Sequence, residues 1–363
     1  MRTFGVNLGP RSYPVHVGAG ILDQLGTLAL EAGLRGGRVA VVTDSNVGPL
    51  YLRRVTETLD GSKFDPIAIE FAAGEASKSM AVLESIYDRL IAAGIERSGA
   101  IVALGGGVVG DLAGFAAATY LRGVALVQVP TTMVAQVDSA LGGKTGVNHR
   151  AAKNLIGAFY EPRMVLADVA TLSTLGQREY REGLAEVIKY GAIMDEPFLG
   201  ELERGLDAIE ARDTQQLEAI VERSLRHKAF VVERDEHESG LRRILNFGHT
   251  IGHALEAGFG YGRYLHGEAV AVGMVAAARL SETYAGLSAA QSERLRALIA
   301  AMGLPVELPP GWAGEDFIRA IKLDKKRLGD KVEFVLLDRL GHALTHRIDA
   351  EEIIEQLSSQ SAA

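Results

Sequence analysis

In the first half of the chain, short apolar runs alternate with stretches in which apolar residues recur at helical spacing. Residues Met80 to Ala93 show the helical spacing. The apolar runs are bounded by glycine, proline or charged residues, as buried strands are, and they cover Arg38 to Asp44, Pro66 to Phe71, Ala100 to Leu104 and Val124 to Val129. Alternation of this kind predicts a parallel sheet with helices on both faces.

The pattern changes after about Leu172, where long amphipathic stretches predominate. They predict helices over Arg178 to Met194, Thr214 to Arg234, Gly248 to Ala257, Gly267 to Tyr284 and Ala289 to Met302. Only two segments of this half look like strands, Lys331 to Leu337 and Ala343 to Arg347. We therefore expect an α/β fold. A Rossmann-like parallel-sheet domain, residues 1–172, would be followed by a mostly α-helical domain, residues 173–363, with the active site in the cleft between them.

Composition narrows the classes of function. The net charge of −8 over 363 residues argues against a nucleic-acid partner, which usually meets a basic surface. There is no cysteine, so a bound metal must be held by nitrogen and oxygen ligands. No apolar stretch approaches the ~20 residues of a membrane span, and the start of the chain is not typical of a secretory signal. We expect a cytoplasmic protein with no membrane partner.

A glycine-rich loop follows the strand over Ala100 to Leu104. Gly105 to Asp111 satisfies the G-x-G-x-x-G spacing between a strand and a helix, where glycine lets the backbone approach a pyrophosphate. The acidic residue expected about 20 positions later is missing. Asp44, at the end of an earlier strand, is our candidate for the ribose contact instead. A tight strand–helix turn that needs glycine for packing would give the same pattern.

Three of the nine histidines lie close together in the sequence. His249 and His253 are four positions apart and so share one helix face, where they can bind a metal or supply one ligand and one base. The loop Gly258 to Leu265 can return His266 to that helix. Glu186 lies in an otherwise apolar helical stretch, which is costly unless the carboxylate is paired or bound to metal. Such donors with a vacant position suit catalytic Zn²⁺ or Co²⁺. The isolated histidines are typical of ordinary hydrogen-bonded side chains, namely His227, His237, His342 and His346.

Several basic residues stand in apolar or glycine-rich surroundings. They are Lys144, Lys153, Lys189, Lys228 and Arg242, and Lys325 and Lys326 follow Asp324 near the end of the chain. Any one of them is more typical of solvated surface. Several together near a metal site indicate a pocket for an anion such as a phosphate monoester.

Taken in order, these segments resemble the 3-dehydroquinate synthases, a family of sugar-phosphate cyclases. The resemblance spans Thr43 to Leu337 and rests on many short matches, none specific alone. They are Thr43 to Val47, Gly74 to Lys78, Gly105 to Asp111, Pro130 to Thr132, Gln136 to Ser139, Gly142 to Asn148, Lys153 with Asn154, Gly183 to Lys189, Arg242 with Asn246 to His249, Leu265 to Glu268 and Asp324 to Lys326.

The resemblance implies a role for each matching residue. The metal ligands would be Glu186, His249 and His266. The catalytic set would be His253, an acid/base group and not a ligand, with Lys144, Lys189, Arg242 and Asn246. NAD would be bound by Asp44, Asn46, Glu75, Lys78, Gly106, Gly107, Val108, Asp111, Thr131, Thr132, Asp138, Lys144, Lys153, Thr171 and Thr174. Substrate would be held by Asn154, Lys228, Lys325 or Lys326, and by Arg122 of a neighbouring subunit, which implies a homodimer.

The implied reaction belongs to the shikimate pathway of aromatic amino acid biosynthesis. The substrate would be 3-deoxy-D-arabino-heptulosonate 7-phosphate, a sugar acid phosphate. NAD and one divalent metal would support a transient oxidation, phosphate elimination, re-reduction and an intramolecular aldol closure to 3-dehydroquinate. Three alternatives stay open. They are another sugar-phosphate cyclase that makes an inosose or a valiolone, a metal-dependent polyol dehydrogenase, and a non-catalytic NAD-binding regulator.

Overall fold

The chain forms two compact units, each described here by itself. A computed structural model describes residues 1–150, 152–260, 263–313, 317, 319, 327–328 and 331–361. Unit 1 comprises Met1–Leu175 and Leu217–Glu233, and unit 2 comprises Gly176–Gln216 and Arg234–Ala363. Among the described residues, no helix combines the length and the apolar character that crossing a membrane requires.

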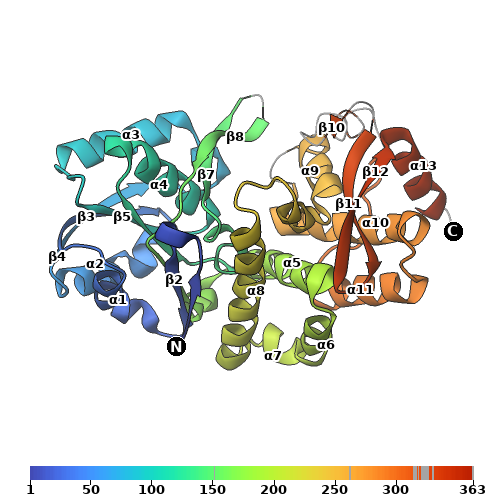
Figure 1. Ribbon diagram of the computed structural model, residues 1–363, viewed down its shortest axis with the longest axis horizontal. Coiled ribbons are helices and arrows are strands. Elements are labelled where there is room, and N and C mark those ends of the chain that lie inside the picture. Colours follow the sequence, from blue (N-terminus) through green and yellow to red (C-terminus); the bar gives the residue numbers. More distant parts are fainter. Residues whose placement is uncertain are drawn as a thin grey trace. The chain divides into compact units, whose positions relative to one another are not determined.

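Unit 1 is built around a seven-stranded sheet in the order β1-β2-β9-β6-β5-β3-β4 (Figure 1). The strands are β1 (Arg2–Val6), β2 (Tyr13–Gly18), β3 (Gly37–Asp44), β4 (Phe64–Phe71), β5 (Ala100–Gly105), β6 (Ala125–Pro130) and β9 (Met164–Asp168). β1 runs antiparallel to β2, and every other neighbouring pair is parallel. All six residues of β5 are buried, as expected for a central parallel strand with both faces covered.

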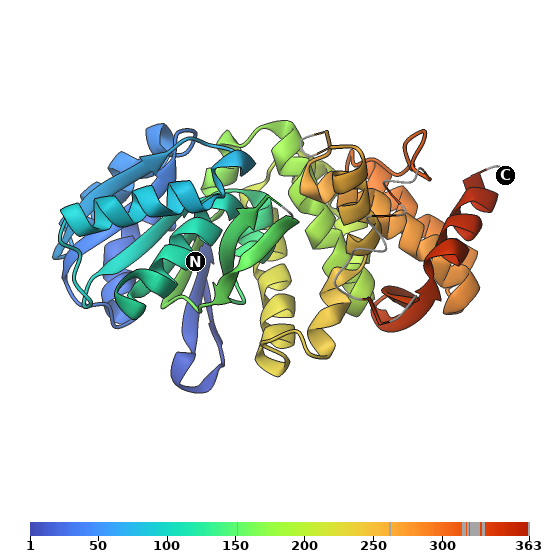
Figure 2. The same ribbon diagram turned by 90° about the horizontal axis from the view of Figure 1, so that it is seen from above.

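Helices cover both faces of this sheet, as the alternating pattern predicts. Side chains of α1 (Leu25–Glu31) and α2 (Arg53–Asp60) pack on one face, against Val39 and Val41 of β3. Those of α3 (Met80–Ala92) and α4 (Gly107–Thr119) pack on the other face. In Figure 2 the ribbons of α3 and α4 lie on the opposite side of the sheet from those of α1 and α2. Most of α8 (Thr214–Arg234) also belongs to unit 1.

A separate two-stranded hairpin consists of β7 (Lys144–His149) and β8 (Ala152–Phe159). β7 packs against α4, whereas β8 exposes both of its faces. Leu155 is 44% exposed and Phe159 43%. This hairpin is absent from our sequence predictions, as are β1, β2 and β9.

Unit 2 is mostly helical, with a three-stranded antiparallel sheet. Its helices are α5 (Gln177–Met194), α6 (Glu196–Arg204), α7 (Leu206–Glu210), α9 (His249–Gly258), α10 (His266–Tyr284), α11 (Ala289–Ala301) and α13 (Ala350–Ser361). The sheet consists of β10 (Arg327–Leu328), β11 (Lys331–Arg339) and β12 (His342–Asp349). Most residues of α10 are buried, and it packs against α5, α9, α11 and β11 (Figure 1). The α/β fold class is confirmed, and each predicted element lies within two residues of its observed bounds.

Candidate active site

The three predicted metal ligands meet in unit 2, each from a different helix. Glu186 lies in α5, and His249 and His266 are the first residues of α9 and α10. Oε1 of Glu186 is 3.6 Å from Nε2 of His249 and 3.7 Å from Nε2 of His266. One donor atom from each of the three lies within 4.8 Å of the others. Three nitrogen and oxygen donors at this spacing are typical of a catalytic metal site that keeps a position for substrate.

Glycine allows the three helices to approach closely. A Cβ atom on Gly267, at the start of α10, would lie 1.9 Å from the backbone oxygen of Glu182 in α5. A Cβ atom on Gly273, further along α10, would lie 2.0 Å from the backbone oxygen of Gly248, which precedes α9. Real side chains do not tolerate either distance. Residues without a side chain therefore hold α5, α9 and α10 near enough for their donors to meet.

Two glutamates fix the start of α10, where His266 lies. Glu182 Oε2 accepts a hydrogen bond of 3.0 Å from the backbone N–H of Gly267. Glu268 Oε2 accepts one of 2.8 Å from the N–H of Leu265, as the third residue of a helix often does. Both bonds use backbone donors that the helix itself leaves unpaired, so they set where α10 begins.

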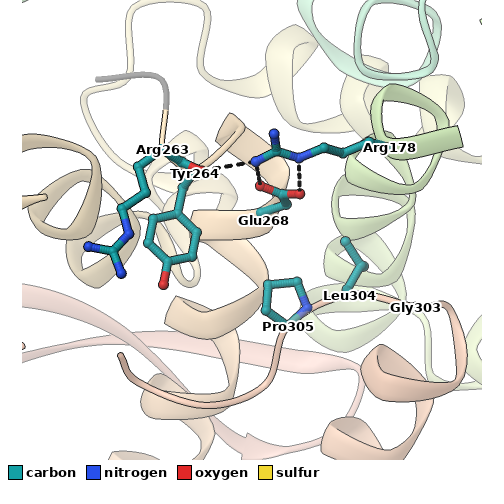
Figure 3. A pocket seen from close by; sticks show the side chains of 7 residues that line it. All are labelled: Arg178, Arg263, Tyr264, Glu268, Gly303, Leu304 and Pro305. Atoms are coloured by element: carbon teal, nitrogen blue, oxygen red, sulfur yellow. Dashed lines mark hydrogen bonds and ion pairs between the residues drawn. The ribbon is translucent and has the colours of Figure 1, made fainter. Parts of the chain in front are cut away.

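A pocket in unit 2 lies beside this helix start but contains none of the predicted site residues. It is lined by Arg178, Arg263, Tyr264, Glu268, Gly303, Leu304 and Pro305 (Figure 3). The Arg178 guanidinium binds both carboxylate oxygens of Glu268, at 2.6 and 2.7 Å, and donates to the backbone oxygen of Arg263. These bonds of Arg178 therefore stabilise the segment that precedes His266.

The Glu186 carboxylate is the buried anion of the site. Its side chain is 1% exposed, and Oε1, the oxygen that faces the two histidines, accepts no hydrogen bond from the described residues. Lys189, one turn later in α5 and also buried, forms an ion pair with Oε2. A buried carboxylate with unfilled hydrogen-bonding capacity is costly unless a cation completes its coordination. The donor set therefore fits a divalent ion.

His266 faces a carboxylate on each side of its ring. Nε2 faces Glu186, and Nδ1 lies 3.4 Å from Oε2 of Glu256 in α9. Burial lowers the pKa of His266, but the hydrogen bond to Glu256 and the charge of Glu186 outweigh it, so the pKa is raised. Glu256 is 7% exposed and was not among the predicted site residues. The sequence signal for it is weak, because an acid near the end of a short helix is usually solvated.

His253 lies one helical turn after His249 and is exposed. Its ring centroid is 5.5 Å from that of His249 and 6.0 Å from that of His266. It therefore borders the three donors without belonging to their set. With Glu256 and His266 it forms a second group whose donor atoms lie within 4.8 Å of one another.

A buried carboxylate organises the segment that carries the predicted residues Arg242 and Asn246. Asp235 accepts hydrogen bonds from the backbone N–H groups of Ser239, Gly240 and Arg242 and from the Ser239 hydroxyl. Burial alone would raise the pKa of Asp235, but these bonds lower it to about 2. Sequence analysis missed Asp235, because an acidic residue with other acidic residues nearby is typical of a solvent-exposed loop.

The two side chains that this segment presents are themselves held in place. Arg242 is 2% exposed, and its Nη1 donates to the backbone oxygen of Glu236 at 2.5 Å. Nδ2 of Asn246 donates to Oε1 of Glu238 at 2.7 Å. Arg242 and Asn246 lie near the start and at the end of the 3₁₀ helix η8 (Leu241–Asn246), so a single loop positions both.

In unit 1, the predicted nucleotide residues gather at the carboxyl ends of the parallel strands. Gly106 caps the start of α4, directly after β5, and Thr131 and Thr132 follow β6. Asp44 ends β3, and its Oδ1 accepts hydrogen bonds from the N–H groups of Asn46 and Val47. Oγ1 of Thr131 is buried without a hydrogen-bond partner among the described residues. Helix starts at strand ends are where open parallel sheets bind phosphate groups.

A buried lysine links three further predicted residues of unit 1. Lys78, 6% exposed, forms an ion pair with Asp111 and donates to Oδ1 of Asn154 at 2.5 Å. Burial raises the pKa of Asp111, although the charge of Lys78 opposes that shift. Glu75 accepts a 2.7 Å hydrogen bond from Asn148, whose Oδ1 in turn accepts one from the Asn154 backbone. The structure therefore brings these residues into one network.

A second lysine of unit 1 binds the predicted residue Asp138. Lys228 of α8 lies 3.0 Å from Oδ1 of Asp138 and donates to its backbone oxygen at 2.7 Å. Thr171 is buried and accepts a hydrogen bond from Gln136, so its hydroxyl has a structural partner.

The remaining predicted residues of unit 1 are located by the elements that carry them. Gly107 and Val108 start α4, Lys144 starts β7, Lys153 lies in β8, Thr174 ends η7 (Val169–Thr174) and Arg122 ends η5 (Tyr120–Arg122). Lys325 and Lys326 lie outside the described residues.

Comparisons with known proteins agree over nearly the whole chain. Residues 68–182 match the family described as 3-dehydroquinate synthase N-terminal, and residues 183–327 match the one described as 3-dehydroquinate synthase C-terminal. A protein of Geobacter metallireducens named 3-dehydroquinate synthase is 51% identical over 356 residues, which is 98% of each chain.

Two solved structures have the same fold. One is a 2-deoxy-scyllo-inosose synthase complexed with carbaglucose-6-phosphate, NAD⁺ and Co²⁺, with a TM-score of 0.89 and 28% identity over 99% of this chain and 100% of that one. The other is a 2-epi-5-epi-valiolone synthase from Streptomyces hygroscopicus with NAD⁺ and Zn²⁺ bound, with a TM-score of 0.86 and 28% identity over 96% and 97%. The relative of much higher identity carries the 3-dehydroquinate synthase name, as do both matched segments. The chain belongs to the 3-dehydroquinate synthase family.

Proposed function

We propose that this protein converts 3-deoxy-D-arabino-heptulosonate 7-phosphate to 3-dehydroquinate and phosphate, as a carbon–oxygen lyase. Its family membership supports the reaction, and one structural observation carries it. Glu186, His249 and His266 converge from three helices, and Oε1 of the buried carboxylate accepts no hydrogen bond from the described residues. A regulator that only binds a nucleotide has no need for such a set.

One divalent cation, Zn²⁺ or Co²⁺, is the proposed occupant of this set, and NAD is the proposed nucleotide. The donors are imidazole nitrogens and a carboxylate oxygen, which suit both ions. Of the two solved relatives, one holds NAD⁺ with Co²⁺ and the other NAD⁺ with Zn²⁺. When bound, the cation supplies a Lewis acid for the reacting hydroxyl, and NAD⁺ supplies a hydride acceptor that is regenerated within each turnover.

In the proposed reaction, oxidation of the substrate's C5 hydroxyl makes the neighbouring C–H acidic, which allows phosphate to leave by elimination. Reduction of the ketone, ring opening and an aldol closure then complete the product. An imidazole nitrogen of His253 holds or moves a proton beside the reacting carbons. His253 suits this role because it borders the donor set and is exposed to an incoming substrate.

The anionic groups of the substrate need fixed cationic and amide partners. Arg242 and Asn246 present such groups from one loop, and Lys189 lies beside Glu186. Lys228, Asn154 and Lys144, all of unit 1, stay predicted substrate contacts. Because Arg242 and Lys228 are buried and already hydrogen-bonded, they are oriented before substrate arrives. The roles of Lys325 and Lys326 stay predictions.

The proposed NAD site lies on the sheet of unit 1. The start of α4, with Gly106, Gly107 and Val108, offers backbone N–H groups to the pyrophosphate. Asp44 is the proposed ribose contact, and among the described residues the hydrogen bonds of the adjacent turn go to its Oδ1 and not to its Oδ2. The other proposed nucleotide contacts are Asn46, Glu75, Lys78, Asp111, Thr131, Thr132, Asp138, Lys144, Lys153, Thr171 and Thr174.

We also propose a homodimer in which Arg122 reaches the substrate of the partner subunit. Leu121 and Arg122 have left-handed backbone conformations, with φ of 50° and 63°, so the chain turns sharply where Arg122 projects. Strand β8 exposes Leu155, Ile156 and Phe159, and exposed apolar side chains on a strand are typical of a surface that another chain covers. A cytoplasmic location stays a prediction.

Product identity tests the proposed branch of the superfamily. Purified protein with NAD⁺ and Zn²⁺ should form 3-dehydroquinate, identified by mass spectrometry, from the heptulosonate phosphate. Glucose 6-phosphate serves as the control, since the inosose synthase binds a carba analogue of it. Cyclisation of glucose 6-phosphate with no reaction of the heptulosonate would overturn the proposal.

A further inference from the structure

Glu256 is a buried acid whose presence the metal ligands alone do not explain. It lies in α9, three residues after His253, and is 7% exposed. Its Oε2 is 3.4 Å from Nδ1 of His266, on the opposite side of that ring from Glu186. A carboxylate is buried at a cost, so a partner that uses its charge and its acceptor oxygens is expected.

The two nitrogens of His266 have different surroundings. A neutral imidazole carries one N–H and one lone pair, and a hydrogen bond to one nitrogen decides which of them holds the proton. A carboxylate can only accept, so Glu256 favours the proton on Nδ1. The lone pair is then on Nε2, the nitrogen that lies 3.7 Å from Oε1 of Glu186. This is the tautomer that a cation between Glu186, His249 and His266 requires.

We infer that Glu256 is a positioning residue, which acts through His266 to hold that ring in its metal-binding tautomer and orientation. The inference rests on the proposed metal site and deepens it. Carboxylates behind metal-binding histidines raise the basicity of the ligand nitrogen and fix the ring, and their removal typically weakens metal binding by about 10–100-fold.

A different reading of the same residues is a second cation site made of His253, Glu256 and His266, whose donor atoms also lie within 4.8 Å of one another. Neutral His266 has a single lone pair, however, and cannot bind a cation at each nitrogen without losing its last proton. Occupation of the Glu186 site therefore excludes a second ion on His266. The positioning role needs no such deprotonation.

Measurement of metal affinity and stoichiometry distinguishes the positioning role of Glu256 from a second cation site, and it does not require an activity assay. Wild type, Glu256→Ala, Glu256→Gln and the control Glu282→Gln, which removes a carboxylate further along α10, would be stripped of metal and titrated with Co²⁺ against a chromogenic chelator. The visible absorption of bound Co²⁺ reports the ligand geometry, and circular dichroism checks that each variant is folded.

We expect one Co²⁺ per chain in every variant. Glu256→Ala should bind it about 10–100-fold more weakly, with an altered Co²⁺ spectrum. Glu256→Gln should recover part of the affinity, because its amide oxygen can still accept from Nδ1–H, and Glu282→Gln should match the wild type. A merely structural role for Glu256 would change folding and leave the spectrum of bound Co²⁺ as it is.

Two results would overturn the inference and leave the proposed function intact. One is a folded Glu256→Ala protein with wild-type affinity and spectrum, and the other is a wild type that binds two ions where Glu256→Ala binds one. A wild type that binds no divalent ion would instead overturn the proposed function together with the inference.

Discussion

Oε1 of Glu186 lies 3.6 Å from Nε2 of His249, although the two side chains come from helices far apart in the sequence. The contact joins α5 to α9, and the first residue of α10 completes the set. Because the carboxylate is buried and each helix supplies one donor, the site depends on how the helices pack. Single substitutions at the donors should therefore remove metal without dismantling the fold.

Glu186→Gln should abolish stoichiometric Zn²⁺ binding and lower turnover to background. The amide keeps the shape of the side chain but loses the charge that attracts the cation and pairs with Lys189. Zinc content after gel filtration and the steady-state rate would be compared with those of His346→Gln, a control histidine in β12. A folded Glu186→Gln protein with full zinc and wild-type turnover would refute the assigned ligand set.

His253→Ala should lower kcat by about 10²–10⁴ if His253 transfers a proton in the reaction. Metal content should stay unchanged, since this side chain lies beside the donor set. The pH dependence of kcat should also lose one of its limbs. Unchanged kcat in the variant would rule out the acid/base role.

Asp235→Asn should destabilise the protein and alter its response to acid. The pKa of Asp235 is lowered to about 2, below its value of about 3.9 in an unfolded chain. A carboxylate with a lowered pKa stabilises the fold fully above the unfolded pKa, and this contribution fades as pH falls toward 2. The shift corresponds to roughly 2–3 kcal/mol.

Urea unfolding at several pH values would measure this effect. Asp235→Asn should also raise KM, because Asp235 holds the loop of Arg242 and Asn246. The difference in unfolding free energy between wild type and Asp235→Asn should be largest at pH 5 and above, and smaller by roughly half at pH 3. A difference independent of pH would show that the charge of Asp235 is not what stabilises the loop.

Arg122→Ala should be inactive alone and partly rescued by mixing with His249→Ala. If Arg122 serves the partner's site, a mixed dimer contains one site with its own metal ligands and an intact Arg122 from across the interface. After unfolding and joint refolding of equal amounts, about a quarter of wild-type activity should return. Activity that stays at the level of the separate variants would place Arg122 in its own subunit's site.

Elements with strong apolar periodicity could be predicted from the sequence, and weakly patterned elements could not. The buried strand β5 and the long helix α10 differ little from their expected bounds. β8 was missed because its residues are mostly exposed and show no period of two. The sequence also gives no indication that most of α8 packs with unit 1, since an amphipathic face does not specify its partner.

Within the site, the donors could be predicted and the residues that support them could not. The spacing of His249 and His253 and the loop before His266 indicated a cluster, and the ring centroids of His249 and His266 do lie 5.2 Å apart. Asp235 and Glu256 were not predicted, because the sequence alone does not distinguish a buried acidic residue from a solvated one. Only the packing around them distinguishes the two.

Simultaneous measurement of phosphate and NADH tests the central claim most directly. The purified protein would be incubated with 3-deoxy-D-arabino-heptulosonate 7-phosphate, Zn²⁺ and NAD⁺ well below the substrate concentration. We predict phosphate release in large excess over the NAD⁺ present, with no net NADH, because the hydride returns within each turnover. No phosphate from this substrate, with NADH accumulating on simple polyols, would contradict the account and make the protein a dehydrogenase.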